Sequence, residues 1–210
     1  MKKMKLDEAR ELLSGFNKFE ASNRNDQKPG RALQLIERVE LLKTQEFKPM
    51  VKVSTTVLVP IRDESGKAPG DTGYAGHMKG DRADFVFFYN RTFARFFSPF
   101  ICAALNMPAS EAAGLTGEEV QKLALSVMQC DGQATGVLDG TVVLDITAET
   151  SAPYPDKKKP GSLTTSVNTN GFEHVPLASL AEHLNEKDIA KFFGSEERFM
   201  ELVAAEESEG

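Results

Sequence analysis

The sequence predicts an α+β protein that is mainly β: a five-stranded barrel with helices inserted between the third and fourth strands and further helices at both ends. Three observations indicate this class. The segment "MVKVSTTVLVP" (50–60) alternates with period two and is rich in β-branched residues. The spacing of apolar residues becomes helical after residue 90, and alternation returns from residue 136. The length of 210 residues, 40% of them hydrophobic, is enough for one core with appendages.

The N-terminal part of the chain contains one predicted helix and one predicted strand. Residues 4–19 carry apolar side chains at helical spacing, and "NRNDQKPGR" (23–31) is a polar turn and linker. The segment "ALQLIERVELLK" (32–43) alternates imperfectly, because Glu37 interrupts it. We interpret it as the first strand rather than a helix, because the clear strand at 50–60 follows it.

The second and third strands flank a long loop. In the second strand the valines share one side and polar residues the other: Val51, Val53, Val57 and Val59 against Lys52, Ser54 and Thr56. Residues 61–82 are rich in glycine and charge, which is typical of a loop. The segment "ADFVFFYN" (83–90) is the predicted third strand, with Phe85, Phe87 and Tyr89 on one face and Val86 and Phe88 on the other.

The second half of the chain adds helices, a hairpin and more helices. Residues 91–107 and 116–128 are predicted helices, in which Phe96, Phe97 and Phe100 are expected to pack inward. Residues 136–149 form the predicted fourth strand, with Val142, Leu144 and Ile146 inward, and 162–175 form the fifth. Two further helices are predicted at 176–194 and 195–207, the second with Ser195 as its N-cap.

Three strands, a helix before the fourth strand and a final hairpin occur in the chain order of an OB-fold, a small Greek-key barrel. We therefore divide the chain into an N-terminal helix and linker (1–29), an OB-fold-like domain (30–175), and C-terminal helices with an acidic tail (176–210).

Charge is distributed unevenly along the chain. The formal net charge is −6, and the segment from Glu182 to Gly210 holds nine acidic against three basic residues. This segment accounts for the whole net charge, so residues 1–181 are near neutral. An acidic balance argues against indiscriminate coating of nucleic acid, but it leaves room for a local basic surface.

Signatures of catalysis and metal binding were not found. The sequence has no HExxH pair, no G-x-S-x-G and no Walker loop, so we expect no enzymatic activity and no cofactor. The three histidines are far apart and the two cysteines, Cys102 and Cys130, are scattered, so we expect buried thiols and no metal site. No apolar run is long enough for a membrane span and the N-terminus lacks a signal pattern, which predicts a cytoplasmic protein.

Three stretches carry a resemblance to a known family: "ERVELLKTQEFKPMVKVSTTVLVP", "FFSPFICAALNMP" and "GVLDGTVVLDITAETSAPYPDKKKPGSLTTSVNTNGF". Together they resemble a group of bacteriophage OB-fold single-stranded-DNA-binding proteins, over residues 30–175. The matching pieces are Leu42-Lys43, Val51 to Val59, Ala103 to Met107, Leu138-Asp139-Gly140 with Val143, and Lys158-Lys159-Pro160-Gly161 with Thr165. The acidic end "AAEESEG" is similar to the acidic ends of such proteins, but it lacks their terminal aromatic residue.

The resemblance implies binding of single-stranded DNA without sequence preference, in phage replication or recombination inside the bacterial host. Such binding needs cations for phosphates and exposed rings for bases. In OB-folds, strands two and three and the loops joining strands one to two and four to five provide them. The candidate residues are Lys43, Phe47, Lys48, Lys52, Phe87, Tyr89, Tyr154, Lys157, Lys158 and Lys159.

Each candidate also has a structural interpretation. A charged hairpin tip is often only solvated, and phenylalanines on a strand are more often core than platform. Alternatives to DNA binding are a non-enzymatic β-barrel accessory factor of a phage, which docks replication or recombination proteins of phage or host, and a virion component. The sequence leaves open whether the chain forms homo-oligomers and whether DNA or RNA is preferred.

Overall fold

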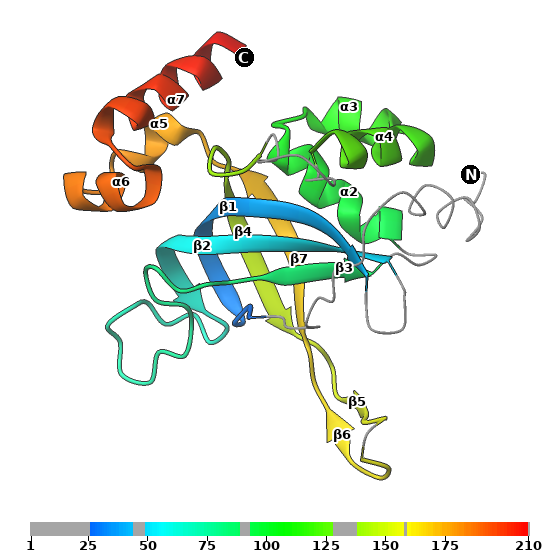
Figure 1. The fold of residues 1–210 in the computed structure, drawn as a ribbon. Coiled ribbons are helices and arrows are strands. Elements are labelled where there is room, and N and C mark those ends of the chain that lie inside the picture. Colours follow the sequence, from blue (N-terminus) through cyan, green and yellow to red (C-terminus); the bar gives the residue numbers. More distant parts are fainter. Residues whose placement is uncertain (1–25, 44–48, 89–92, 128–137, 158, 210) are drawn as a thin grey trace.

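The computed structural model describes residues 26–43, 49–88, 93–127, 138–157 and 159–209. Its centre is a five-stranded antiparallel sheet (Figure 1). Along the sheet the strands lie in the order β3 (Phe85–Phe88), β2 (Pro49–Asp63), β1 (Gly30–Lys43), β4 (Val143–Thr150) and β7 (Val167–His174). The prediction of an α+β protein built on five strands is confirmed, and the strand prediction for 32–43 is correct.

The long strand β1 holds the sheet together because it is shared by two partners. It pairs with β2 over its whole length and with β4 through Gly30 to Leu35. Three register shifts in the β1–β2 ladder mark bulges, which bend and twist a strand pair. Gly30 opens β1 with φ +134°, and a Cβ there would clash with the Arg62 carbonyl oxygen, so only glycine fits.

The two edge strands approach each other through aromatic rings. The Phe172 ring on β7 lies 5.8 Å from Phe85 and 6.2 Å from Phe87, both on β3. Among the described residues no backbone ladder joins β3 to β7, so the predicted closed barrel is not seen there. Of the strand predicted at 83–90, β3 covers Phe85–Phe88, and residues 89 and 90 lie outside the described residues.

Helices cover one face of the sheet beside β3 and β7. They are α2 (Phe93–Ala104), α3 (Ala109–Gly114) and α4 (Gly117–Val127). Phe97, Phe100 and Ile101 of α2 are fully buried against the sheet, where Val53 and Ile146 belong to the same core cluster. The predicted helices at 91–107 and 116–128 therefore form close to the expected bounds, and they supply half of this core.

The C-terminal helices cover part of the opposite face (Figure 1). They are α5 (Leu177–Leu180), α6 (Glu186–Phe193) and α7 (Glu196–Glu209). Their apolar side chains, such as Phe193 and Phe199, pack on Leu33, Leu58 and Val143. Strand β4 is therefore buried on both sides, whereas the sequence predicted only Val142, Leu144 and Ile146 inward.

The predicted helix at 176–194 is divided in two. Asn185 accepts a hydrogen bond from the Asp188 amide and the Asp188 carboxylate accepts one from the Asn185 amide, a capping box that begins α6. Ser195 caps α7 as expected, because its hydroxyl accepts a hydrogen bond from the Arg198 amide at 3.1 Å. Within the described residues, none of the helices combines the length and apolarity that a bilayer crossing requires. The helix predicted at 4–19 lies outside the described residues.

Candidate nucleic-acid interface

A hairpin that we call the arm, residues 151–166, projects from the sheet where β4 ends and β7 begins (Figure 1). Its base is closed by two hydrogen bonds: the Ser151 amide donates to the Ser166 carbonyl at 2.7 Å, and the Ser166 amide donates to the Ser151 hydroxyl at 2.9 Å. Beyond this base the arm carries a small ribbon of β5 (Tyr154–Pro155) and β6 (Leu163–Thr164).

The tip of the arm is a tight turn. The Ser162 amide donates to the Lys159 carbonyl at 3.1 Å, and Gly161 has φ +86°. Proline at the second position and a left-handed glycine at the third are the pattern of a type II turn. Lys159 is the first residue of this turn and Lys157 lies two residues before it, and both are exposed. The sequence-predicted lysine tip therefore points positive charge into solvent.

The ribbon has two chemically different faces, set by its register. Tyr154 pairs with Thr164 and Pro155 pairs with Leu163. Because neighbouring residues of a strand point to opposite sides, the tyrosine and the leucine lie on opposite faces. Tyr154 is 43% exposed and Leu163 is 69% exposed. One face thus offers an aromatic ring with a hydroxyl, and the other offers an aliphatic side chain.

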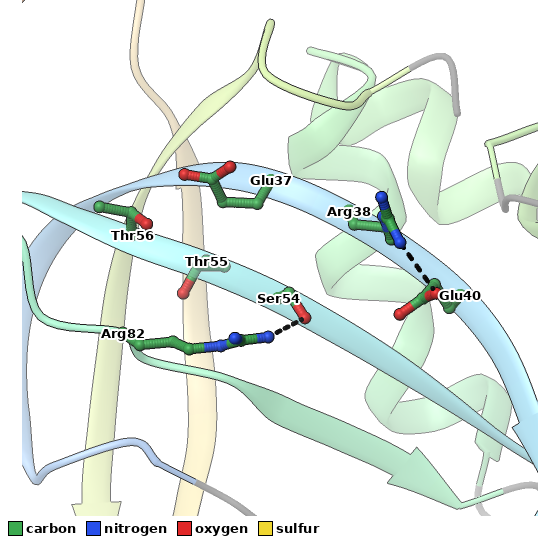
Figure 2. Close-up of a pocket in the computed structure, with 7 residues that line it drawn as sticks. All are labelled: Glu37, Arg38, Glu40, Ser54, Thr55, Thr56 and Arg82. Carbon is green, nitrogen blue, oxygen red and sulfur yellow. Dashed lines mark hydrogen bonds and ion pairs between the residues drawn. The ribbon is translucent and has the colours of Figure 1, made fainter. Parts of the chain in front are cut away.

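A second candidate surface lies on the outer side of β1 and β2, next to Arg82. An open depression of about 400 Å³ lies there, and Figure 2 shows the side chains that line it. It is lined by Glu37, Arg38, Glu40, Ser54, Thr55, Thr56 and Arg82. We call it the outer depression. The Arg82 guanidinium donates to the Ser54 hydroxyl at 3.3 Å, and Arg38 lies 3.4 Å from Glu40.

Charge in and beside the outer depression is balanced. Lys52 forms an ion pair with Asp84 at 2.8 Å, and the Arg82 Nε donates to both oxygens of the same carboxylate at 2.9 Å. Burial alone would raise the pKa of Asp84, but the hydrogen bonds from Arg82 and Lys52 outweigh it and hold that pKa below its ordinary value. Three cations therefore face three carboxylates on this side of the sheet, and Lys52 is not a free phosphate ligand.

Phe87, a predicted base-contacting residue on β3, lies on the face of the sheet that packs against α2. Phe87 is only 7% exposed, and its ring lies 5.2 Å from Phe97 and 5.5 Å from Phe100. Its prediction as a base-contacting residue is therefore not supported by its position, because α2 covers that face of β3. Phe88 points the other way and is 44% exposed, next to the β2 strand that carries Lys52.

Phe96 also departs from its expected place. It was predicted to pack with Phe97 and Phe100, but about half of it is exposed, and the Arg95 guanidinium lies 5.7 Å from its ring centre. The alternation of 83–90 could have suggested Phe88, because the sequence assigns it to the face opposite Phe87. For Phe96 the apolar residue type misled the prediction, since only the direction of α2 distinguishes it from its neighbours.

Five further predicted residues lie at or beyond the ends of the described segments. Phe47, Lys48, Tyr89 and Lys158 lie outside the described residues, and Lys43 is the last residue of β1. Cys102 is a buried free thiol, as expected, and burial raises its pKa. Among the described residues no three His, Cys, Asp or Glu side chains gather as metal ligands.

Comparison with models of known protein families gave no match, and comparison with curated protein sequences gave none. The functional assignment therefore depends on the arm, the outer depression and the exposed rings described above.

Proposed function

We propose that this protein binds single-stranded DNA, largely without sequence preference, through the arm and the outer side of β2 and β3. In fold terms we propose an OB-fold whose barrel is partly open. The chain order of the sheet strands, with helices between β3 and β4, supports this assignment. In such a fold the arm is the loop between strands four and five, which is one of the two loops that contact oligonucleotides.

The observation that carries the proposal is the composition of the arm. It brings an exposed tyrosine within a few residues of two exposed lysines, on a hairpin that leaves the body of the protein. A tyrosine can stack on any base, which is worth about 1–3 kcal/mol per base, and lysines can neutralise phosphates. Neither contact reads base identity, so sequence preference is expected to be weak.

The outer side of the sheet is expected to contribute less to the binding affinity than the arm. Phe88 offers a second ring beside β2, where Lys52 and Arg82 lie. Both cations are bound to Asp84, so a phosphate must compete with that carboxylate. We therefore expect moderate affinity that falls steeply with salt, rather than the tight binding of a strongly basic groove.

Direct binding measurements with charge-reversed variants test the proposal. Fluorescence polarisation with oligo-dT at several salt concentrations is applied to the double variant Lys157→Glu/Lys159→Glu. Its affinity should fall at least tenfold, and the slope of log K against log salt should decrease by about 1.4, since each lost phosphate contact in a single strand contributes about 0.7. The matched control is Lys122→Glu/Lys187→Glu, which reverses two exposed lysines on α4 and α6 and should bind like the original protein.

Unchanged binding by the arm variant would show that the arm is not part of the interface. An equal loss of affinity in the control would show that the effect comes from the change in net charge alone. A biological role in phage replication or recombination is part of the same proposal. It predicts that the protein protects single strands from nucleases and does not protect duplexes of the same length.

A second candidate function is a protein-interaction accessory factor. The observation in its favour is Leu163, an aliphatic side chain that is more exposed than any other large hydrophobic residue among those described. Capture of a protein partner by the arm, together with no polarisation change on single strands, would favour this function over nucleic-acid binding.

A further inference from the structure

The aliphatic face of the arm is not accounted for by nucleic-acid binding. Leu163 is 69% exposed and shares its face with Pro155, opposite the face that carries Tyr154. Bases stack on flat rings, and a leucine side chain does not provide one. A ribbon of only two residue pairs is also short of the size that is stable alone in water, so its extended position is best explained by a surface that covers it.

A complementary surface is present on the C-terminal helices. Met200 of α7 is 56% exposed, and the exposed side chains of Glu196 and Glu197, four and three residues before it, lie on the same side of the helix. The α7 surface offers the apolar side chain of Met200 with carboxylates beside it. The arm offers the apolar side chain of Leu163 with lysines further along the hairpin. The two surfaces therefore agree in both apolar character and charge sign.

These two surfaces cannot meet within one molecule. Figure 1 shows the arm and α7 at opposite ends of the structure, with the sheet between them. The base of the arm is fixed by the Ser151–Ser166 hydrogen bonds, so the arm cannot fold back to α7 without breaking its junction with the sheet. A contact between the arm and α7 must therefore join two copies of the chain.

We propose that two copies of this protein associate by exchanging arms: Leu163 of each copy lies against Met200 of the other, and the lysine tip faces the acidic side of α7. Each copy has one arm and one α7 surface, so a two-fold axis can satisfy both contacts and close the assembly. This contact uses the face of the arm opposite Tyr154, and it does not depend on nucleic-acid binding.

Sedimentation velocity of the full chain, over about a hundredfold range of concentration at low and high salt, tests the association. The sedimentation coefficient should rise with concentration at low salt, and high salt should weaken the association. Leu163→Asp and Met200→Asp should each raise the protein concentration at the midpoint of association at least about tenfold. Each replaces an apolar side chain that the proposed contact would bury. The matched control Thr164→Asp adds the same charge on the other face and should shift it less than either.

A disulfide experiment identifies the contact itself. A Leu163→Cys chain mixed with a Met200→Cys chain should give a disulfide-linked pair under mild oxidation, whereas either chain alone should give less of it. The proposal is overturned if the protein remains a monomer at every concentration, if Leu163→Asp associates as well as the original chain, or if no mixed disulfide forms. Tyr154→Ala separates the two proposals: it should weaken binding of oligo-dT and leave self-association unchanged.

Discussion

Lys52 Nζ lies 2.8 Å from Asp84 Oδ2, and both side chains are largely withdrawn from solvent. The same carboxylate accepts two hydrogen bonds from Arg82 Nε. Asp84 thus neutralises Lys52 and Arg82, and it limits the positive charge that this side of the sheet can offer to a phosphate backbone.

Replacement of the Asp84 carboxylate should lower the stability of the protein and raise its affinity for single-stranded DNA. Asp84→Asn leaves the half-buried Lys52 without its counter-ion, so the free energy of unfolding should fall by about 1–3 kcal/mol. Affinity for oligo-dT at low salt should rise several-fold, because Lys52 and Arg82 become available to phosphates. Urea denaturation and fluorescence polarisation measure the two effects, with Glu118→Gln on α4 as a control that removes an exposed ion-paired carboxylate elsewhere. If affinity does not rise, the outer side of the sheet is not part of the interface.

Two adjacent phenylalanines on β3 should respond in opposite ways. Phe87→Ala removes a ring packed on Phe97 and Phe100 and should cost about 3–5 kcal/mol of stability. Phe88→Ala should cost much less stability, but it should weaken oligo-dT binding by about 1–3 kcal/mol through the loss of one stacked base. Thermal unfolding and polarisation distinguish the two. Phe88→Ala with full affinity would show that no base stacks there.

The buried imidazole of His77 should make the fold sensitive to mild acid. Its Nε2 accepts a hydrogen bond from the Lys28 amide at 2.9 Å. Burial, reinforced by the nearby charge of Lys28, lowers the pKa of His77 to about 4 against the opposing effect of Asp81. Between pH 6.5 and 4 the unfolded chain binds a proton at this imidazole and the folded chain does not, so stability is fully present above pH 6.5 and falls by roughly 3 kcal/mol across this range.

Urea denaturation at pH 7, 5.5 and 4.5 measures this dependence. His77→Gln should flatten the profile, because glutamine does not titrate, and the exposed His183→Gln should leave it unchanged. A steep acid dependence that persists in His77→Gln would assign the effect to another group.

Glu206 should hold α7 to the end of β7. One carboxylate oxygen lies 2.8 Å from His174 Nε2, and the other accepts a hydrogen bond from the Leu177 amide at 2.7 Å. Glu206→Gln keeps one acceptor and should destabilise the docking of α7 by about 1–3 kcal/mol. Hydrogen exchange of the α7 amides should then speed up more than that of the sheet, whereas the exposed Glu207→Gln should change neither. Equal acceleration in both variants would show that the hydrogen bonds do not hold the helix.

The sequence predicts the strands and most helices well, because each depends on local periodicity. The alternation at 50–60 marks β2, and the capping pattern at Ser195 marks α7. It is less reliable at element ends, as at β4, which begins at Val143 rather than residue 136, since the turn at Asp139 to Thr141 interrupts the pattern. Asn185 was not recognised as the start of a second helix.

The candidate site was predicted less completely than the fold. The exposure of Lys157, Lys159 and Tyr154 could be predicted, because a hairpin tip stays in solvent whatever packs elsewhere. Which of Phe87 and Phe88 is exposed could not be predicted, because their exposure depends on which face α2 covers. The neutralisation of Lys52 depends on Asp84, which lies 32 positions further along the chain. A pairing between residues so far apart does not appear in local sequence patterns.

The sequence by itself determined the identity and order of the strands, the helical segments and the charged tip of the arm, because these follow from periodicity and turn chemistry over a few residues. Only the tertiary structure decided which rings are buried, which cations are free, and that the arm and α7 lie too far apart to touch. Those properties depend on packing between distant segments, which sets exposure and pairing through contacts that neighbouring residues do not specify.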